Sequence, residues 1–406
     1  MPLTTRSSEA NQATPHHVGS DAAKQTVNHR RPAIDLLRGL AVIGMILVAY
    51  AGDWAHRFTV LTHAEWRGFA IADMIFPSFL FCVGVVLPFS LERRLRAASP
   101  AQVCIGILRR GAALFGLGLL LQLLPFFDFS TVRVMGILQR IGLCYVLAGF
   151  IVLALGTRGP PTFTLPLSRA IAAAAIVALG YAALLLWWDA PECGRACFDS
   201  VHALPAVIDR AVLGTHHMWP YGTTNGIVTY EPEGLISTLG SLINVLIGVS
   251  TGLVLRRGGG THGSVVLRLA LAGVLLLVGG LLMGSALPVV KKIWTPSFAV
   301  LSAGFSLLCL SALLVLTTKA RFAGTPIKVF GINATLAFIV VSLLDVLLQF
   351  PFSSLPRVTL HDTFTTLLGS VIPDARVASV TYSLVLLGVV GLLLWPLLRK
   401  GIYFRL

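Results

Sequence analysis

The residue pair best suited to chemistry lies in the segment LTHAEWRGFAIADMIFPSFLF, which carries His63 and Asp73. Histidine can take and return a proton near neutral pH, and a carboxylate can fix its tautomer. Ten residues separate the two side chains, so their contact requires the loop between them to fold back. Asp73 stands just inside an apolar run, where a carboxylate must find a partner or line a cavity. The alternative for His63 is a solvated structural residue at a membrane interface.

Two further groups of polar side chains stand at the ends of apolar runs. Arg38 follows Asp35 by three residues, so both can share one helix face. This pair could clamp an anionic ligand through the guanidinium, or it could be a topology anchor with a local ion pair. Arg133, Gln139 and Arg140 fall within two helical turns and could line a polar cavity, although hydrogen bonds between membrane helices would need the same residue types.

The remaining candidates are more scattered. Glu233 stands near the start of an apolar run, where it either binds substrate or complements a helix dipole. Ser297 and Asn333 are polar positions within or beside later apolar runs. Trp66 and Trp294 could stack against the ring of a sugar.

Membrane-spanning helices must position these residues. Only 12% of the 406 residues are charged and 56% are apolar, with a mean hydropathy of +0.84. A water-facing core cannot bury so much apolar surface, so lipid must be the main solvent. We therefore expect an all-α, polytopic membrane protein. Ten runs are long enough to cross a bilayer, at about twenty residues each: 33–51, 69–91, 104–125, 134–156, 168–188, 233–255, 264–286, 295–316, 327–350 and 379–398.

The charge distribution predicts the orientation of these spans. The net charge of +14 could suggest nucleic acid, but most of the 31 basic residues fall in alternate loops. The positive-inside rule then places both termini in the cytoplasm, and we expect no nucleic-acid partner. Most acidic residues fall on the outer side. They either serve a cationic ligand there or remain where basic residues are excluded.

The chain divides into a polar tail and a membrane domain. Residues 1–30 are polar and non-periodic, which predicts a disordered cytoplasmic tail, and residues 31–406 form the membrane domain. The longest outer loop, 189–232, contains Cys193 and Cys197, whose spacing permits but does not prove a disulfide. No zinc-type Cys/His pattern, phosphate-binding loop or dinucleotide fingerprint occurs, so we expect no metal.

Several motifs together resemble a known family. They are IDLLRGLAVIGMILV, HAEWRGFAIADMIFPSFLFCVG, RVMGILQRIGLCY, YEPEGLISTLGSLINVLIG, IWTPSFAVLSAGF and GINATLAFI, in this order from Arg31 onwards. The chain is similar in them to heparan-α-glucosaminide N-acetyltransferases and their bacterial relatives. The resemblance implies a multi-pass protein of the bacterial inner membrane. It would take acetyl-CoA from the cytosol and acetylate the amine of a glucosamine-containing saccharide on the periplasmic side, with a homodimer left open.

The resemblance also implies roles for individual residues. His63 matches the family's active-site histidine, and Asp73 matches the element that follows it. Other family motif positions are matched by Arg133, Gln139, Arg140, Glu233, Ser297 and Asn333. We expect CoA to enter from the side of Arg38. Two positions depart from the pattern: Ala49 replaces a common asparagine, and Val341 replaces a histidine of the animal enzymes. A transporter of N-acetylglucosamine or its oligosaccharides, and an O-acyltransferase of envelope polysaccharide, are the alternative functions.

Overall fold

A computed structural model gives the fold. It describes residues 32–159, 162–257, 262–318, 324–351, 358–402 and 404. The chain divides into two units, Met1–Pro32 and Ala33–Leu406. The predicted tail at residues 1–30 lies outside the described residues. The account below concerns the unit from Ala33 onwards, whose first helix also includes Pro32.

The predicted all-α membrane architecture is confirmed. Nine helices in the described part of the chain are long and apolar enough to cross a membrane, and a bent pair makes a tenth candidate span. The nine are α2 (Pro32–Ala49), α3 (Ile75–Ala97), α4 (Pro100–Leu123), α5 (Ile137–Leu155), α6 (Leu167–Trp187), α8 (Ser237–Arg257), α9 (His262–Met283), α10 (Pro296–Thr318) and α14 (Ala375–Arg399).

The long helices form a core surrounded by lipid-facing neighbours. About three quarters of the apolar window is buried in α3 and α8, but only 17% in α9 and 28% in α4. The large apolar residues exposed on α4 and α9 are leucine, isoleucine and valine, which suit lipid contact. α3 and α8 approach each other closely because Gly84 has no side chain: a Cβ there would collide with the backbone of Val245.

The predicted span at 327–350 is interrupted in the structure. This stretch is two helices, α11 (Thr325–Ile332) and α12 (Ala334–Gln349), bent by 85°. Asn333 lies in the break, where its amide nitrogen donates to the Ile402 carbonyl at 3.3 Å and its oxygen accepts the Phe404 N–H at 2.8 Å. The side chain therefore ties the break to the carboxyl-terminal segment, which hydropathy alone does not reveal.

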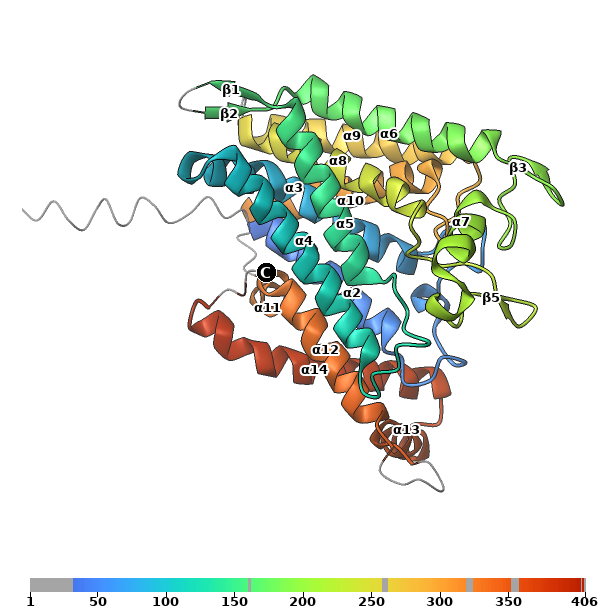
Figure 1. Cartoon of the computed structure of the whole chain (residues 1–406). Helices are drawn as coiled ribbons and strands as arrows, with labels where there is room; N and C mark the ends of the chain where they lie inside the picture. The colour runs from blue at the N-terminus through green and yellow to red at the C-terminus, as the bar shows by residue number, and fades with distance from the viewer. Residues whose placement is uncertain are drawn as a thin grey trace, which may run out of the picture. The chain divides into compact units, whose positions relative to one another are not determined.

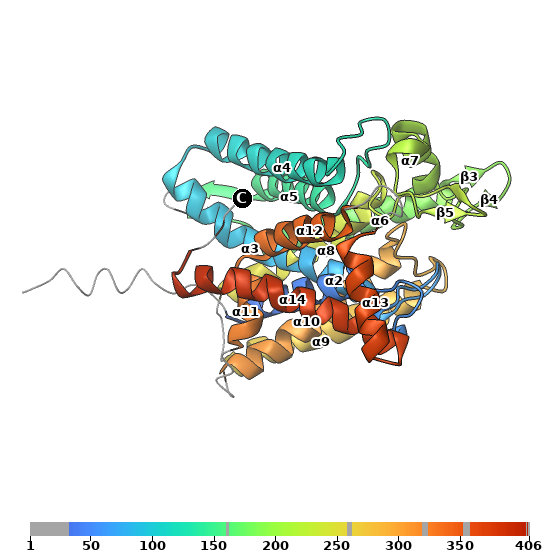
Figure 2. The same cartoon turned by 90° about the horizontal axis from the view of Figure 1, so that it is seen from below.

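Shorter elements lie at the two ends of the long helices. A hairpin of β1 (Thr157–Gly159) and β2 (Thr162–Thr164) lies at one end, and the 189–232 segment lies at the other (Figures 1 and 2). That segment contains the antiparallel pairs β3–β4 and β5–β6, with α7 and a 3-10 turn between them. The bounds are β3 Asp189–Ala190, β4 Gly194–Arg195, α7 Leu204–Leu213, η3 Thr215–His217, β5 Thr223–Thr224 and β6 Ile227–Val228.

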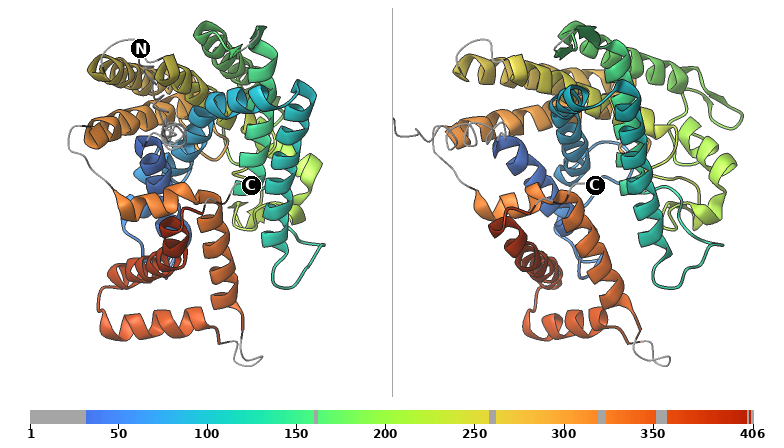
Figure 3. Two further views of the ribbon diagram at one scale, coloured as in Figure 1. Left: turned by 90° about the vertical axis from the view of Figure 1, so that its left-hand side faces the viewer. Right: turned by 60° about the vertical axis from the view of Figure 1, so that its left-hand side comes forward.

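Two of the described α-helices lie outside the predicted spans: α7, within the predicted outer loop, and α13. α13 (Leu360–Val371) has no buried residue and lies crosswise to α12, beyond the ends of the long helices (Figure 3). Its apolar and polar residues occupy opposite faces, as in helices that lie along a membrane surface. The 12-residue length is too short to span a bilayer, so it gave no signal in the search for spans.

Candidate functional site

His63 and Asp73 meet at one end of the bundle. The loop between α2 and α3 folds back through two 3-10 turns, η1 (Thr59–Leu61) and η2 (Ile71–Met74). The His63 Nδ1 atom lies 2.8 Å from the Asp73 Oδ1 atom. The second carboxylate oxygen accepts the backbone N–H groups of Ala64 at 3.1 Å and Ala70 at 2.8 Å. Asp73 is fully buried, whereas 36% of the His63 side chain is exposed, so the carboxylate is fixed and the imidazole reaches the surface.

Sequence reasoning missed a third member of this site, Lys291. Its Nζ atom lies 2.9 Å from His63 Nδ1, 3.3 Å from His63 Nε2 and 3.2 Å from Asp73 Oδ1. Lys291 comes from the loop between α9 and α10 and stands beside Lys292, so the pair looked like an ordinary charged edge of a span. The neighbouring Lys292 instead donates to the Glu65 carbonyl.

The surroundings favour a neutral imidazole. Burial lowers the pKa of His63 below its usual value, and the nearby charge of Lys291 acts in the same direction. The hydrogen bond to Asp73 opposes this shift. Since a carboxylate can only accept, the ring proton belongs on Nδ1, and the lone pair is on Nε2, which lies 3.3 Å from the Lys291 Nζ atom. Burial also lowers the pKa of Lys291.

A second charged cluster lies at the same end, built on Arg133. Its Nε atom lies 3.0 Å from Glu231 Oε2, and one of its Nη atoms lies 2.5 Å from Glu233 Oε2. Glu231 also accepts the backbone N–H of Trp219 at 2.8 Å. The sequence analysis did not single out Glu231. Because the guanidinium holds both carboxylates, Glu233 is part of an ion-pair network and not an isolated acid.

Arg140 and Trp294 form the buried floor beside that cluster. The Arg140 guanidinium is fully buried, donates to the Gly234 carbonyl at 3.0 Å and to the Ser237 hydroxyl, and lies 5.0 Å from the Trp294 ring centroid. Its Nε and Nη1 atoms have no hydrogen-bond partner among the described residues. The Trp294 indole donates to Asn244 at 2.9 Å. Trp294 is therefore a packed core residue.

The other sequence candidates divide between the two ends of the bundle. Ser297 is buried and donates to the Pro288 carbonyl at 3.2 Å, and Gln139 is buried against Gly118. Arg38 lies far from them, near the start of α2, and its guanidinium bonds Asp35 at 3.0 Å and the Gly331 carbonyl. Asn333 is in the adjacent helix break. We name the two ends of the bundle the His63 end and the Arg38 end.

A hollow lies between these ends. It is lined by residues of five helices, all apolar except Thr335: Met45, Phe79, Leu114, Ile137, Leu138, Ile141, Ala334, Thr335 and Phe338. Met45 stands about 10 Å along α2 from Arg38, because each helical residue rises about 1.5 Å. A second small hollow, lined by residues that include Arg57 and Ser379, lies beside the loop after α2. His63 lines neither of the two.

The two departures from the family pattern have polar neighbours. Val341 is fully buried in α12, and Ala49 is the last residue of α2. The residues that follow each of them form a hydrogen bond: the Tyr50 hydroxyl lies 2.9 Å from the Ser342 hydroxyl. This chain thus joins α2 to α12 by a polar contact next to both positions.

The fold and the site define a multi-helix membrane protein with a His–Asp–Lys group at one end of the bundle. The family model described as heparan-alpha-glucosaminide N-acetyltransferase, catalytic, matches residues 30–205, which include His63 and Asp73. The heparan-alpha-glucosaminide N-acetyltransferase of Mus musculus is 25% identical over 350 residues, covering 77% of this chain and 53% of the mouse protein. The protein of that name from Homo sapiens is 25% identical over 352 residues, with coverages of 76% and 52%.

These matches confirm the resemblance that the motifs indicated. The chain spans about half the length of the two relatives it matches. The matched family segment ends at residue 205, so it includes Arg133 and Arg140 but not Glu233 or Lys291. The match to the family model therefore says nothing about the latter two residues.

Proposed function

We propose that this protein is a membrane acetyltransferase. It moves an acetyl group from acetyl-CoA on the cytosolic side to the amine of glucosamine, or of a glucosamine-containing saccharide, on the opposite side. In a bacterium this would be the periplasmic side of the inner membrane. The observation that carries the proposal is the 2.8 Å contact between His63 and the buried Asp73, within the segment whose sequence matches the acetyltransferase family model.

The proposed reaction uses His63 as the base. Its Nε2 atom takes a proton as the acceptor nitrogen attacks the thioester carbonyl, and Asp73 stabilises the imidazolium that forms. When the tetrahedral intermediate collapses, the C–S bond breaks, and the His63 imidazolium returns its proton to the thiolate of CoA. Lys291 keeps the ring neutral beforehand, so the ring is ready to accept that proton. A transient acetyl group on His63 is the kinetic alternative, with the same products.

The proposed path of the donor runs from the Arg38 end to the His63 end. Arg38 offers a guanidinium to a CoA phosphate, which would compete with Asp35 for its N–H groups. The apolar hollow around Met45 and Phe338 lies between the two ends. It supports a route for the narrow pantetheine arm, and side-chain movement must open the remaining distance to His63.

The proposed acceptor site lies beside His63. The Trp66 indole donates to the Phe198 carbonyl at 2.6 Å, and its ring meets Tyr230 edge-on at 5.0 Å between centroids. Lys292 lies 5.3 Å from the Tyr230 ring centroid. This aromatic group suits the apolar face of a sugar ring. Trp294 and Glu233 act behind it, Trp294 as packed floor and Glu233 as a counter-charge that holds Arg133.

Purified protein in detergent tests this proposal. With acetyl-CoA and glucosamine, we expect free CoA and N-acetylated product. His63→Ala should abolish turnover, whereas His216→Ala, which changes an exposed histidine of the 189–232 segment, should not. An ester product would indicate O-acyl transfer. Retained sugar binding without CoA release would favour a transporter, and full activity of His63→Ala would refute the assignment of the base.

A further inference from the structure

Two arginines meet a single tyrosine inside the helical bundle. The Arg94 Nη1 atom, from α3, donates to the Tyr145 hydroxyl at 3.2 Å. The Arg110 guanidinium, from α4, lies over the face of the same ring, 4.8 Å from its centroid. Tyr145 belongs to α5 and is buried. Three neighbouring helices thus bring two positive charges to one aromatic ring, and we call Arg94 and Arg110 the arginine pair.

Close packing of α4 on α5 brings the second of these charges to the ring. A Cβ on Gly142 of α5 would lie 2.8 Å from the Gly111 backbone oxygen of α4, so the two helices meet backbone against backbone. Gly111 directly follows Arg110, and Gly142 precedes Tyr145 by three residues. The glycines therefore fix the guanidinium against the ring.

The arginine pair lies within the length of the candidate spans. α3 ends and α4 begins at the Arg38 end of the bundle (Figure 2). Arg110 stands ten residues after Pro100, the first residue of α4, which is about 15 Å along the helix. The Arg94 Nη1 atom would lie 3.8 Å from a Cβ on Gly106, so it also lies beside α4 inside the span. Ionisable residues at such depths pair with an opposite charge or line a polar cavity.

No carboxylate of the described residues pairs with either guanidinium. In that part of the chain Arg94 bonds only the tyrosine hydroxyl, and the buried Nε atom of Arg110 has no hydrogen-bond partner. Two other arginines at this end are neutralised: Arg96 and Arg256 share Glu92, at 2.7 and 2.8 Å. The arginine pair shares a neutral tyrosine instead, so the described chain supplies no counter-ion for it.

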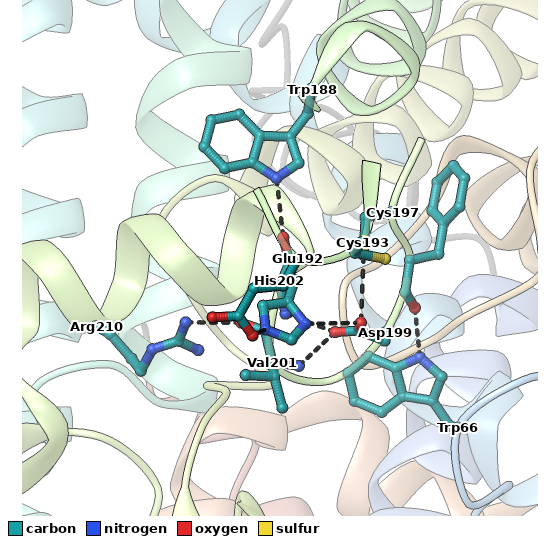
Figure 4. The surroundings of a disulfide bond; sticks show 10 residues. Trp66, Trp188, Glu192, Cys193, Cys197, Asp199, Val201, His202 and Arg210 are labelled. Carbon is teal, nitrogen blue, oxygen red and sulfur yellow. Dashed lines mark hydrogen bonds and ion pairs between the residues drawn. A yellow bond between two sulfur atoms is a disulfide. The ribbon is translucent and has the colours of Figure 1, made fainter. Parts of the chain in front are cut away.

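The opposite end of the bundle shows how the chain satisfies polar groups from within. In the 189–232 segment, Cys193 and Cys197 form the disulfide that their spacing permits, and Arg210 donates to the Val201 carbonyl at 2.7 Å (Figure 4). The same guanidinium donates to a second carbonyl at 2.6 Å. Among the residues that the structure describes, the arginine pair has no such carbonyl partner.

The donors of this cluster match the oxygens of a phosphate group. A guanidinium forms forked, charge-assisted hydrogen bonds to phosphate oxygens, and two guanidiniums can bond two of them. The Tyr145 hydroxyl accepts from Arg94, so its own proton is available to a third oxygen. A carboxylate has only two oxygens and would leave one of these three donors unused.

Two sources of phosphate reach this end of the bundle. α4 is largely exposed, and Ile105 and Leu108 are exposed on the turn before Arg110, so a phospholipid headgroup is one source. The other source is CoA, which rests on the proposed acetyltransferase function. Leu114, which lines the apolar hollow, stands one helical turn after Arg110, so the cluster adjoins the proposed route of the pantetheine arm.

We propose that Arg94, Arg110 and Tyr145 form a binding site for a phosphate group. The phosphate lies between the two guanidiniums and supplies the counter-charge that the described chain does not. A lipid phosphate in this site links α3, α4 and α5 at the membrane interface. A CoA phosphate in it holds the donor beside the hollow.

Ligand titrations of the full-length protein in detergent test this proposal. One arm titrates phosphatidylglycerol, with bound lipid counted by native mass spectrometry, and the other titrates CoA by calorimetry. Arg94→Gln/Arg110→Gln should weaken binding of the ligand that uses the site by at least about tenfold, because one hydrogen bond to a charged group is worth about that factor.

The neighbouring residues provide a matched control. Arg93→Gln/Arg109→Gln removes the same charge from exposed positions of the same two helices and should leave both affinities unchanged. Arg94→Lys/Arg110→Lys keeps the charges that orient the spans, and should bind more weakly than the wild type because an ammonium lacks the planar fork. This second variant keeps the test valid if the glutamine variant does not fold.

Each result supports the site or overturns it. Weaker phosphatidylglycerol binding by the arginine-pair variants than by the control identifies a lipid headgroup, and weaker CoA binding identifies the donor. Equal affinities of these variants and the control for both ligands would overturn the site. His63→Ala should bind both ligands as the wild type does. The lipid arm requires no acetyl transfer, so failure of the acetyltransferase proposal and failure of this one are distinguishable.

Discussion

Replacing Asp73 by asparagine should abolish catalysis without unfolding the protein. The reason lies in the different partners of the two carboxylate oxygens. Oδ2 accepts two backbone N–H groups, from Ala64 and Ala70, and Oδ1 faces His63. In the Asp73→Asn variant the amide oxygen must stay with the two N–H groups, because an amide nitrogen there would place donors against donors. The amide NH₂ then faces His63.

This exchange reverses the tautomer of the imidazole. With a donor opposite Nδ1, the ring proton moves to Nε2, and the atom that should accept a proton from the acceptor amine no longer can. Loss of general-base catalysis typically costs 10²–10⁴-fold in rate, or about 2.7–5.5 kcal/mol in the activation barrier. Asp73→Ala differs, since it leaves two buried N–H groups without an acceptor and removes the carboxylate that neutralises Lys291, so it should destabilise the fold by about 3–5 kcal/mol.

Steady-state kinetics and thermal unfolding in detergent distinguish these outcomes. We expect Asp73→Asn to lower kcat by the stated factor, with KM for acetyl-CoA and the melting temperature close to those of the wild type. Asp73→Ala should lower both activity and melting temperature. If Asp73→Asn keeps activity within a few-fold of the wild type, the carboxylate does not set the tautomer of His63, and the reasoning is wrong.

Three further predictions concern Lys291, Asp209 and Gly84. Lys291→Met removes a charge that lowers the pKa of His63, so the acid limb of a kcat/KM profile against pH should move to higher pH; an unmoved limb would exclude this role. Burial raises the pKa of Asp209 in α7 to about 7, so its charging costs stability as pH rises from about 4 to 7. Relative to the wild type, Asp209→Asn should therefore have a more favourable change in melting temperature at pH 8 than at pH 5. The same change at both pH values would contradict this. Gly84→Ala should lower the free energy of unfolding by about 1–3 kcal/mol, because the added methyl group pushes α3 away from α8. Gly116→Ala, where the added group meets open space, should not lower it. The melting temperatures of the two variants check this.

The membrane spans were predictable from the sequence, because a run of about twenty apolar residues has few stable environments other than the bilayer. The observed ends of some helices differ from the predicted ends of the spans, because capping residues set them. The predicted span from 104 begins at Pro100 because Ser99 and Gln102 form a capping box. The break at Asn333 was not predictable from hydropathy, because the residues on both sides remain apolar. Its cause is a side chain bonded to Ile402 and Phe404, about seventy residues away in the chain.

The candidate site was predictable in part. An ionisable residue inside an apolar run must have a partner, and that argument singled out Asp73, which does contact His63. The sequence did not identify Lys291 as a site residue, because a lysine at the edge of a span usually marks the membrane interface. Only the fold brings it next to His63. Glu231 was not identified for a similar reason. A loop carboxylate has no signature in sequence that distinguishes solvent from a buried guanidinium.

The contacts around Asn333 also constrain the biosynthesis of the protein. Arg38, in α2, donates to the Gly331 carbonyl, and the neighbouring Asn333 is hydrogen-bonded to Ile402 and Phe404. The contact of α2 with Gly331 therefore forms only after residue 331 has been translated, and the helix break gains its partners only after residue 404. Chains truncated before residue 402 would therefore expose an incomplete surface at the Arg38 end that quality-control proteases recognise.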